Sequence, residues 1–335
     1  MPTDLADYTL YDDSNTIMTM PSTQVNALHE HSTARQFEQH RQAIEARLTE
    51  LLSHHDAPRS VLTDAMHSAV LGSGKRVRPL LLLFIASDLG HDAPSILDLA
   101  CAIEIVHAAS LILDDLPCMD DATLRRGQRT SHLQFGEDVT VLAAVALLSR
   151  AFQIVSGADG ISPAARARLT TVLAQAVGAQ GLARGQFQDL HGAHQRSAAE
   201  IAETNALKTT ALLGVAIEMA VIVADPDVDV TRCLQAFASA AGQAFQIRDD
   251  LLDAGTGPAL EAGDIVGKNT GQDIGKATIP HTLGAGQARR RMEKEVLRAD
   301  QHLYHALGPR NQTRSLLAAL FPQCGLPFRP APPPA

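Results

Sequence analysis

Two aspartate-rich segments are the residues of this sequence whose types and spacing could do chemistry. The first follows the apolar run Ile103–Leu113 and supplies four carboxylates, those of Asp114, Asp115, Asp120 and Asp121. Uncompensated charge at the end of a buried element is costly. The segment therefore favours a functional role, with helix capping or plain surface charge as the alternative.

The second segment begins at Phe245 and carries Asp249, Asp250 and Asp253. Residues three or four apart lie on one face of a helix, so these carboxylates would crowd together, and at a helix C-terminus the macrodipole adds to their repulsion. Hard oxygen ligands in such numbers suit Mg²⁺, which keeps several waters and commonly bridges carboxylates to phosphate oxygens. The two segments together predict two halves of one metal-diphosphate site.

Basic residues in turns alternate with the acidic segments. Each alone is most simply a surface cation, but Lys and Arg groups beside glycine turns and helix N-termini are natural holders of phosphate. As a set they predict anion holders beside metal holders, as a site for two diphosphates requires. The residues are Lys75, Arg78, Arg125, Arg126, Lys208, Lys268 and Lys276.

The elements that position these residues are predicted to be helices. Apolar residues recur at spacings of three and four, and alternating β-branched segments are scarce, which predicts an all-α fold of about ten or more helices. The stretches Leu97–Asp115 and Val139–Val155 are apolar on nearly every side, so we expect both in the centre of a bundle. The first acidic segment then ends one central helix, and the second ends a helix expected over Cys233–Leu252.

Length and composition narrow the interpretation. The chain has 335 residues, 45% of them hydrophobic, and a formal net charge of -9. These values suit one large domain and exclude the basic surface of a general nucleic-acid binder. We expect a loosely ordered tail over residues 1–33, one domain over residues 34–322 and a proline-rich tail over residues 323–335.

The expected compartment is the cytoplasm. The four cysteines are far apart and form no C-x-x-C pair, and the N-terminus is acidic where an export signal would be basic. The longest apolar stretch, Ala211–Ala224, is interrupted by Glu218 and is shorter than the roughly 20 residues that span a bilayer. No transmembrane segment is predicted.

These motifs resemble those of the polyprenyl diphosphate synthase family, in particular the bacterial geranylgeranyl diphosphate synthases of carotenoid pathways. The resemblance covers residues 65–285 and consists of five motifs in the family's order. They are Gly-Lys-x-x-Arg-Pro from Gly74, Asp-Asp-x-x-x-x-Asp from Asp114 with Arg-Arg-Gly after it, the pair Lys208 and Thr209, Phe-Gln-x-x-Asp-Asp-x-x-Asp from Phe245, and a final Gly-Lys.

The resemblance implies the isoprenoid synthase fold, a helical bundle around a deep central cavity, usually assembled as a homodimer. The acidic motifs would face each other at the cavity mouth and bind about two or three Mg²⁺ ions. By this resemblance the metal ligands are Asp114, Asp115, Asp120, Asp249, Asp250 and Asp253. Isopentenyl diphosphate would be held by Lys75, Arg78, His107 and Arg126, and the allylic diphosphate by Arg125, Lys208 and Lys268, with Lys276 helping to close a lid. Without the family, His107 reads more simply as a core histidine.

The implied activity is Mg²⁺-dependent head-to-tail condensation of isopentenyl diphosphate with dimethylallyl, geranyl or farnesyl diphosphate. An allylic diphosphate ionises when metal ions and fixed cations neutralise its leaving group, and an apolar cavity shields the resulting cation from water. Lys208, Thr209 and Gln246 are the expected catalytic residues, the last two as oxygen dipoles beside the cation.

Product length should depend on the residues about one helical turn before Asp114. Ala109 and Ser110 occupy these positions, and both are small. Farnesyl-forming relatives tend to place an aromatic residue there. We therefore expect a twenty-carbon product, geranylgeranyl diphosphate, with a farnesyl diphosphate synthase as the alternative.

Two other functions remain open at this point. A terpene cyclase, which is a lyase, also ionises a prenyl diphosphate at an aspartate-rich motif, but it needs an aromatic-lined pocket, and aromatic residues make up only 4% of this chain. A non-catalytic partner subunit would have no reason to keep mutually repelling carboxylates. One departure from the family pattern is Arg248, where an apolar residue is usual. This side chain would either pair with Asp249 or point outward.

Overall fold

The computed structural model describes most of the chain. It describes residues 8–11, 17–20, 22–53, 60–191, 203–204, 207, 210–253, 284–309 and 311–326, and the side chains of these residues from 35 onward except 253. Lys208, Thr209, Lys268 and Lys276 lie outside the described residues, as does the side chain of Asp253. What the sequence predicts for them stays a prediction.

The chain divides into two units, Met1–Ala43 and Ile44–Ala335. In the first, strands β1 (Tyr8–Tyr11) and β2 (Ile17–Met20) form an antiparallel hairpin in which Tyr8 pairs with Met20, and helix α1 (Ser22–Leu52) begins. The hairpin falls within residues 1–33, for which the sequence predicts a tail. The tail boundaries themselves stay a prediction.

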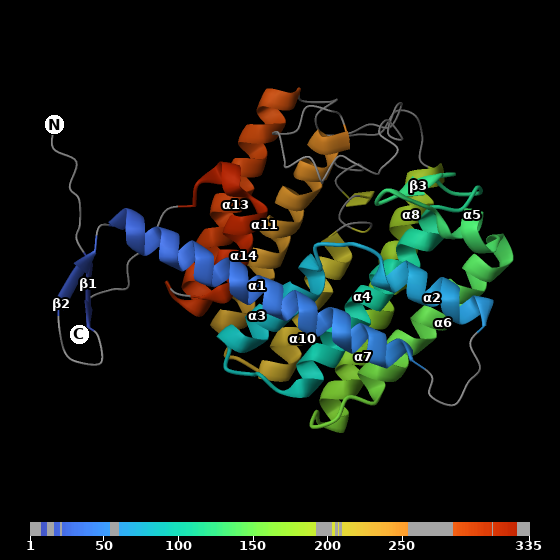
Figure 1. The fold of residues 1–335 in the computed structure, drawn as a ribbon, viewed down its shortest axis with the longest axis horizontal. Helices are drawn as coiled ribbons and strands as arrows, with labels where there is room; N and C mark the ends of the chain where they lie inside the picture. The colour runs from blue at the N-terminus through green and yellow to red at the C-terminus, as the bar shows by residue number, and fades with distance from the viewer. Residues whose placement is uncertain are drawn as a thin grey trace. The chain divides into compact units, whose positions relative to one another are not determined.

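The second unit is a bundle of helices, in which α11 packs along α13 (Figure 1). A two-residue strand pair, β3 and β4, interrupts the helices after α4. The elements are α2 (Val61–Leu71), α3 (Val77–Asp88), α4 (Pro94–Asp114), β3 (Leu124–Arg125), β4 (Gln128–Arg129), α5 (Ser131–Phe135), α6 (Glu137–Ser156), α7 (Pro163–Val177), α8 (Leu182–His191), α10 (Ala211–Ala224), α11 (Val228–Asp253), α13 (Ala285–Leu307), α14 (Gln312–Leu320) and the 3₁₀ turn Pro322–Cys324.

Helix α4 lies inside this bundle because it is apolar on nearly all sides. Pro94 begins it, since the fixed φ of proline suits the first helical turn. Leu99, Ile103 and Val106 are fully buried, and the helix packs on α6, α3, α2 and α10. The prediction that Leu97–Asp115 lies in the centre of the bundle is confirmed.

Helix α6 departs from the same prediction on one face. Leu147 is fully buried, and the helix packs against α4. On the other side Val141, Leu142 and Val145 are 41%, 58% and 60% exposed. The expectation of a central position for Val139–Val155 is therefore wrong for this face, because no element of the described chain covers its apolar side chains.

Helices α4 and α6 are each long and apolar enough to cross a membrane. This test considers only length and composition, and core helices of bundles pass it as well. The most apolar window of α4 is 67% buried inside the protein, and that of α6 is 39% buried. The buried position of α4 accounts for its composition without a membrane.

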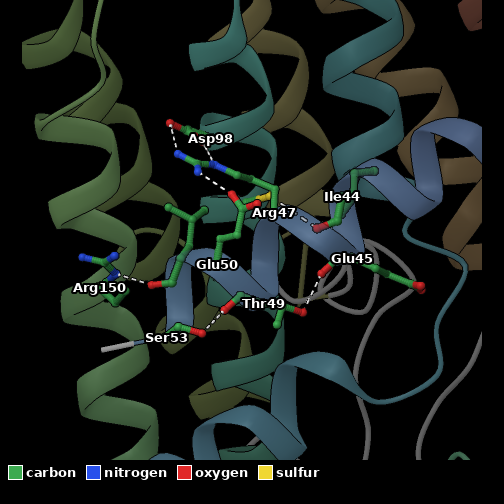
Figure 2. A network of polar contacts seen from close by, with 10 residues as sticks. Ile44, Glu45, Arg47, Thr49, Glu50, Ser53, Asp98 and Arg150 are labelled. Carbon is green, nitrogen blue, oxygen red and sulfur yellow. Dashed lines mark hydrogen bonds and ion pairs between the residues drawn. The ribbon is translucent and has the colours of Figure 1, made fainter. Parts of the chain in front are cut away.

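A polar network joins the end of α1 to α4 and α6 (Figure 2). Arg47 donates to the Asp98 carboxylate of α4 at 2.6 and 3.2 Å, and to Glu50 at 2.7 Å. Arg150 of α6 donates to the carbonyl oxygen of Leu51 at 2.9 Å. The Asp98 hydrogen bonds raise the pKa of Arg47. These contacts hold the first half of α4 in place, far along the helix from its acidic end.

Helix α14 is held between α3 and α13. The carboxylate of Asp88, the last residue of α3, accepts hydrogen bonds from the Gln312 and Thr313 amides at 2.8 and 2.9 Å. These bonds satisfy N–H groups that a helix N-terminus leaves without a partner in the helix. Asp300 of α13 accepts from Arg314 Nε at 2.5 Å. The C-terminal helix is therefore anchored to two others.

Candidate functional site

The first acidic motif begins where α4 ends. Asp114 is the last residue of α4 and Asp115 is its C-cap, and the Asp120 amide donates to the Asp114 carbonyl oxygen at 2.9 Å. This bond brings the two ends of the motif together. Asp115 is 2% exposed, whereas Asp114 and Asp120 are partly exposed. The sequence-predicted carboxylates thus lie on one short turn at the end of a buried helix.

Arg125 reaches Asp115 from the strand pair β3–β4. The hairpin turns through Arg126 and Gly127, whose φ angles of 53° and 78° are the left-handed values that a tight two-residue hairpin requires. Arg125 Nε donates to both Asp115 oxygens at 3.0 and 3.1 Å, and Nη2 donates to Oδ1. Burial opposes the charged form of Arg125. The hydrogen bonds to Asp115, together with the negative charges of Asp115, Asp114 and Asp120, nevertheless raise the Arg125 pKa overall.

The Gly-Lys-x-x-Arg-Pro segment forms the turn before α3, in which Lys75 is exposed. Arg76, the N-cap of α3, has a φ of 50°, and its Nη2 donates to the Gly72 carbonyl oxygen at 2.8 Å. Arg76 Nη1 donates to Glu104 of α4 at 2.7 Å, and these two side chains are 1% and 4% exposed. Sequence reasoning missed this buried pair. The available signal was a lone glutamate in an apolar helix, three residues before His107.

A second contact between the same elements joins Arg78 to His107. Arg78 Nη1 donates to His107 Nε2 at 3.2 Å. The bond requires a neutral ring whose Nε2 carries no proton. Burial, and then the positive charges of Arg78 and Arg126, lower the pKa of His107 well below its usual value. His107 is thus a neutral imidazole among arginine cations.

Arg126 completes a cluster of half-buried cations with Arg78 beside His107. Its guanidinium lies against Gly74, where a Cβ atom would stand 2.8 Å from Nη1, so glycine leaves the room that the arginine occupies. Burial lowers the pKa of both Arg126 and Arg78, while the charge of Glu104 acts in the opposite direction on both. A half-buried cluster with more cations than carboxylates gains stability from an anion such as a diphosphate.

The second acidic motif ends α11. Gln246 Nε2 donates to Asp250 Oδ1 at 2.6 Å, and Asp250 is 5% exposed. Arg248 Nη2 lies 3.4 Å from Asp249 Oδ1, so of the two outcomes expected for Arg248, pairing is the one found. The Asp249 charge also counteracts the lowering of the Arg78 pKa, so this carboxylate acts electrostatically on the basic cluster. In Figure 1 this end of α11 and the β3–β4 hairpin both lie at the upper end of the bundle.

Ala109 and Ser110 lie in α4, one turn before the first acidic motif. Ala109 is fully buried, and the Ser110 hydroxyl donates to the His107 carbonyl oxygen at 2.9 Å. A pocket of about 400 Å³ lies elsewhere, between α7, α10 and α11, where Glu218 and Gln235 line it. None of the candidate site residues borders that pocket, and the deep central cavity stays a prediction.

The acidic residues fit Mg²⁺ by the chemistry of their oxygen atoms. Within the described part of the chain, no three His, Cys, Asp or Glu side chains are grouped so that they could hold a metal ion by themselves. One carboxylate, that of Asp115, is already held by Arg125. A Mg²⁺ ion here would therefore share its coordination sphere with water and substrate oxygens, which is its usual mode in phosphoryl sites.

A model of the polyprenyl synthetase family matches residues 59–306 of this chain. The chain is 45% identical over 298 residues to the geranylgeranyl diphosphate synthase of Pantoea ananas. The aligned residues cover 88% of this chain and 95% of that protein. It is 38% identical over 269 residues to the farnesyl diphosphate synthase of Geobacillus stearothermophilus, with 79% and 89% covered.

A likeness to solved structures extends over nearly the same length. The Helicobacter pylori geranyltransferase complexed with magnesium and isoprenyl diphosphate aligns with a TM-score of 0.74 at 26% identity, over 87% of this chain and 97% of that one. The all-α isoprenoid synthase fold predicted from the sequence is confirmed.

Proposed function

We propose that this chain, which belongs to the polyprenyl synthetase family and is a head-to-tail prenyltransferase, makes geranylgeranyl diphosphate. Its substrates would be isopentenyl diphosphate and the allylic diphosphates of dimethylallyl, geranyl and farnesyl groups. The observation that carries the proposal is the juxtaposition of a half-buried cation cluster, Arg78 and Arg126 beside neutral His107, with two carboxylate motifs.

In this proposal the cation cluster binds the diphosphate of isopentenyl diphosphate. Half-buried Arg78 and Arg126 would supply most of the charge, and Lys75 would reach the same anion from the exposed turn. His107 adds no charge, but its Nε2 fixes the direction of one Arg78 N–H. Arg125 would extend from Asp115 to the allylic diphosphate, joined by Lys208 and Lys268, with Lys276 closing over the site.

The carboxylates of Asp114, Asp115, Asp120, Asp249, Asp250 and Asp253 would hold Mg²⁺. When bound, the metal neutralises charge on the departing diphosphate and so favours ionisation of the allylic group. Gln246 supports this arrangement, because its Oε1 is buried and accepts no hydrogen bond from the described residues. That oxygen is available to face the allylic cation, in the catalytic role proposed for it together with Lys208 and Thr209.

The twenty-carbon product is supported by the small side chains of Ala109 and Ser110 before the first motif. The test is incubation of the purified protein with labelled isopentenyl diphosphate, each allylic starter and Mg²⁺, followed by measurement of product length. We expect geranylgeranyl diphosphate, and no product once a chelator removes the metal. A fifteen-carbon product would indicate a farnesyl diphosphate synthase, a cyclic hydrocarbon a terpene cyclase, and absence of condensation a non-catalytic subunit.

We also propose a homodimer formed through α6. Val141, Leu142 and Val145 are exposed on this helix, and Leu133 of α5 is 38% exposed. Water-exposed apolar side chains gathered on one surface mark interaction sites. Leu142→Glu should convert a dimer to a monomer in light scattering, whereas Gln153→Glu, on the same helix, should not. A wild-type protein that is monomeric at micromolar concentration would exclude the dimer.

The compartment proposed is the cytoplasm, where thiols stay reduced. All four cysteines belong to the described residues, and all are free. Burial raises the pKa of the Cys101 thiol, so this cysteine is a core side chain without thiolate reactivity.

A further inference from the structure

Arg248 precedes Asp249 in α11, and it contacts both its own helix and the C-terminal segment. Its Nη1 donates to the carbonyl oxygen of Leu320, the last residue of α14, at 3.3 Å. Its Cζ lies 4.7 Å from the ring centroid of Phe245 and 5.5 Å from that of Phe321. The two rings meet edge to face at 5.2 Å. Two rings and one carbonyl oxygen therefore hold the guanidinium, and the Arg248 side chain is 13% exposed.

The other arm of the same guanidinium reaches the second acidic motif. Arg248 Nη2 lies 3.4 Å from Asp249 Oδ1, and the Asp249 side chain is 41% exposed. Attraction between charges at this exposure is weak because solvent screens it. What Arg248 supplies to Asp249 is therefore mainly a fixed direction, since the guanidinium cannot move without breaking its contacts with the C-terminal segment.

A fixed direction matters because a second cation also attracts Asp249. The Asp249 charge counteracts the lowering of the Arg78 pKa. If the carboxylate turned toward Arg78, it would leave the metal motif and neutralise a cation of the cluster that awaits a diphosphate. Contact with Arg248 favours the conformation that keeps Asp249 among the metal ligands.

We propose that Arg248 is a positioning residue that orients Asp249 toward Mg²⁺, and that the end of α14 holds Arg248 in place. The inference rests on the proposed function. It makes the C-terminal helix part of the support of the metal site, since α14 is itself anchored to α3 through Asp88 and to α13 through Asp300. Outer-shell partners of this kind tune the affinity of the ligands they orient.

The test is a calorimetric titration of the full-length protein with Mg²⁺ in the presence of inorganic diphosphate, which gives the midpoint of Mg²⁺ binding. Arg248→Met keeps an apolar side chain against the two rings and loses the charge and the polar arms, so the Mg²⁺ midpoint should rise roughly tenfold. Arg248→Lys keeps the charge but not the planar fork, and should behave nearly as badly. Phe321→Leu should raise the midpoint by a smaller factor, roughly threefold. Arg232→Met is the matched control, because Arg232 is exposed on the same helix and pairs with Asp229 at 2.9 Å. The control should leave the midpoint unchanged.

Combining Arg248→Met with Phe321→Leu tests whether the end of α14 acts through Arg248. If Phe321 acts through Arg248, the double variant should be no worse than Arg248→Met alone, whereas independent effects would multiply. A folded Arg248→Met protein with an unchanged or lower Mg²⁺ midpoint would overturn the proposal. A wild-type midpoint in Arg248→Lys would also overturn it, because the positive charge alone would then suffice. Lower thermal stability with an unchanged midpoint would indicate a merely structural arginine. Failure of the proposed function looks different, because the wild-type protein itself would then show no Mg²⁺-dependent condensation.

Discussion

The two acidic motifs consist of the same kind of side chain on unlike supports. In the first, buried Asp115 is matched by Arg125 from a separate hairpin, and the chain closes on itself through the Asp120 amide. In the second, Asp250 is held by Gln246 of its own helix, and Asp249 is held by Arg248, whose orientation depends on the C-terminal helix. The first motif is thus fixed by tertiary pairing nearby, and the second by helix register and a distant segment.

This difference shows that two motifs proposed for the same metal site do not need the same surroundings. A buried carboxylate such as Asp115 needs a counter-charge before any metal arrives, since isolated buried charge is unfavourable. Partly exposed Asp249 needs no such counter-charge, because water screens it, but it needs an orientation. The two motifs should therefore respond alike when their ligands are removed and differently when their supports are removed.

The largest expected effect is the loss of one metal-binding carboxylate. Asp114→Asn and Asp249→Asn should each lower kcat on the order of 10²–10³-fold, because each removes charge that holds Mg²⁺ against the diphosphate. Asp229→Asn, an exposed substitution on α11, should leave the rate unchanged. Steady-state rates at saturating substrate measure the three. If only one of the two motif variants lost activity, the motifs would not share one metal site.

The next largest expected effect is a change in product length, which should follow from a substitution in α4 and not from one in α11. Ala109 lies five residues before Asp114, and Ala244 lies five residues before Asp249. Both are fully buried. Ala109→Phe should shorten the main product to about fifteen carbons, at a stability cost of about 1–3 kcal/mol for overpacking. Ala244→Phe should carry a similar stability cost without the shortening. Chromatography of the extracted products decides. Unchanged product length in Ala109→Phe would remove α4 as the determinant.

Much of this arrangement could be predicted from local pattern. The apolar stretches of α4 and α11 predict both helices, and Asp114 and Asp249 lie in their last turns as expected. The pairing of Arg78 with His107 could not be derived in this way, because it depends on how α3 packs against α4. Arg76 and Glu104 were missed for the same reason, since nothing near either residue in the sequence indicates its partner.

Helix α6 shows the opposite limit. Its apolar residues predicted a central helix, but Leu142 and Val145 are exposed on the surface of the bundle. Periodicity reports that a side chain avoids water and does not report whether its own chain or a second copy covers it.

Removing a support should sharpen the contrast between the motifs. Arg125→Met leaves the Asp115 charge buried without its partner and should lower the free energy of unfolding by about 2–4 kcal/mol. Arg125→Lys should lose less, because the charge remains. Arg184→Met, which breaks an exposed pair with Glu203, should stay within about 0.5 kcal/mol of the wild type. Urea unfolding measures all three. Equal values for the Arg125→Met and Arg184→Met proteins would contradict the tertiary pairing assigned to the first motif.

The smallest expected effect is a pH dependence confined to the α4 side of the site, since α11 contains no histidine. The pKa of His107 is lowered in the folded protein, so below about pH 6.5 the unfolded chain binds a proton that the folded chain refuses. Stability should therefore fall as the pH drops from 7.5 to 5.5, by at most about 1.4 kcal/mol per pH unit from this group. His107→Gln should remove that share of the slope. His305→Gln, which replaces an exposed side chain on α13, should keep the wild-type slope. Unfolding free energies at the two pH values give the comparison, and a His107→Gln slope equal to that of the wild type would mean that the imidazole titrates freely and does not accept the Arg78 hydrogen bond.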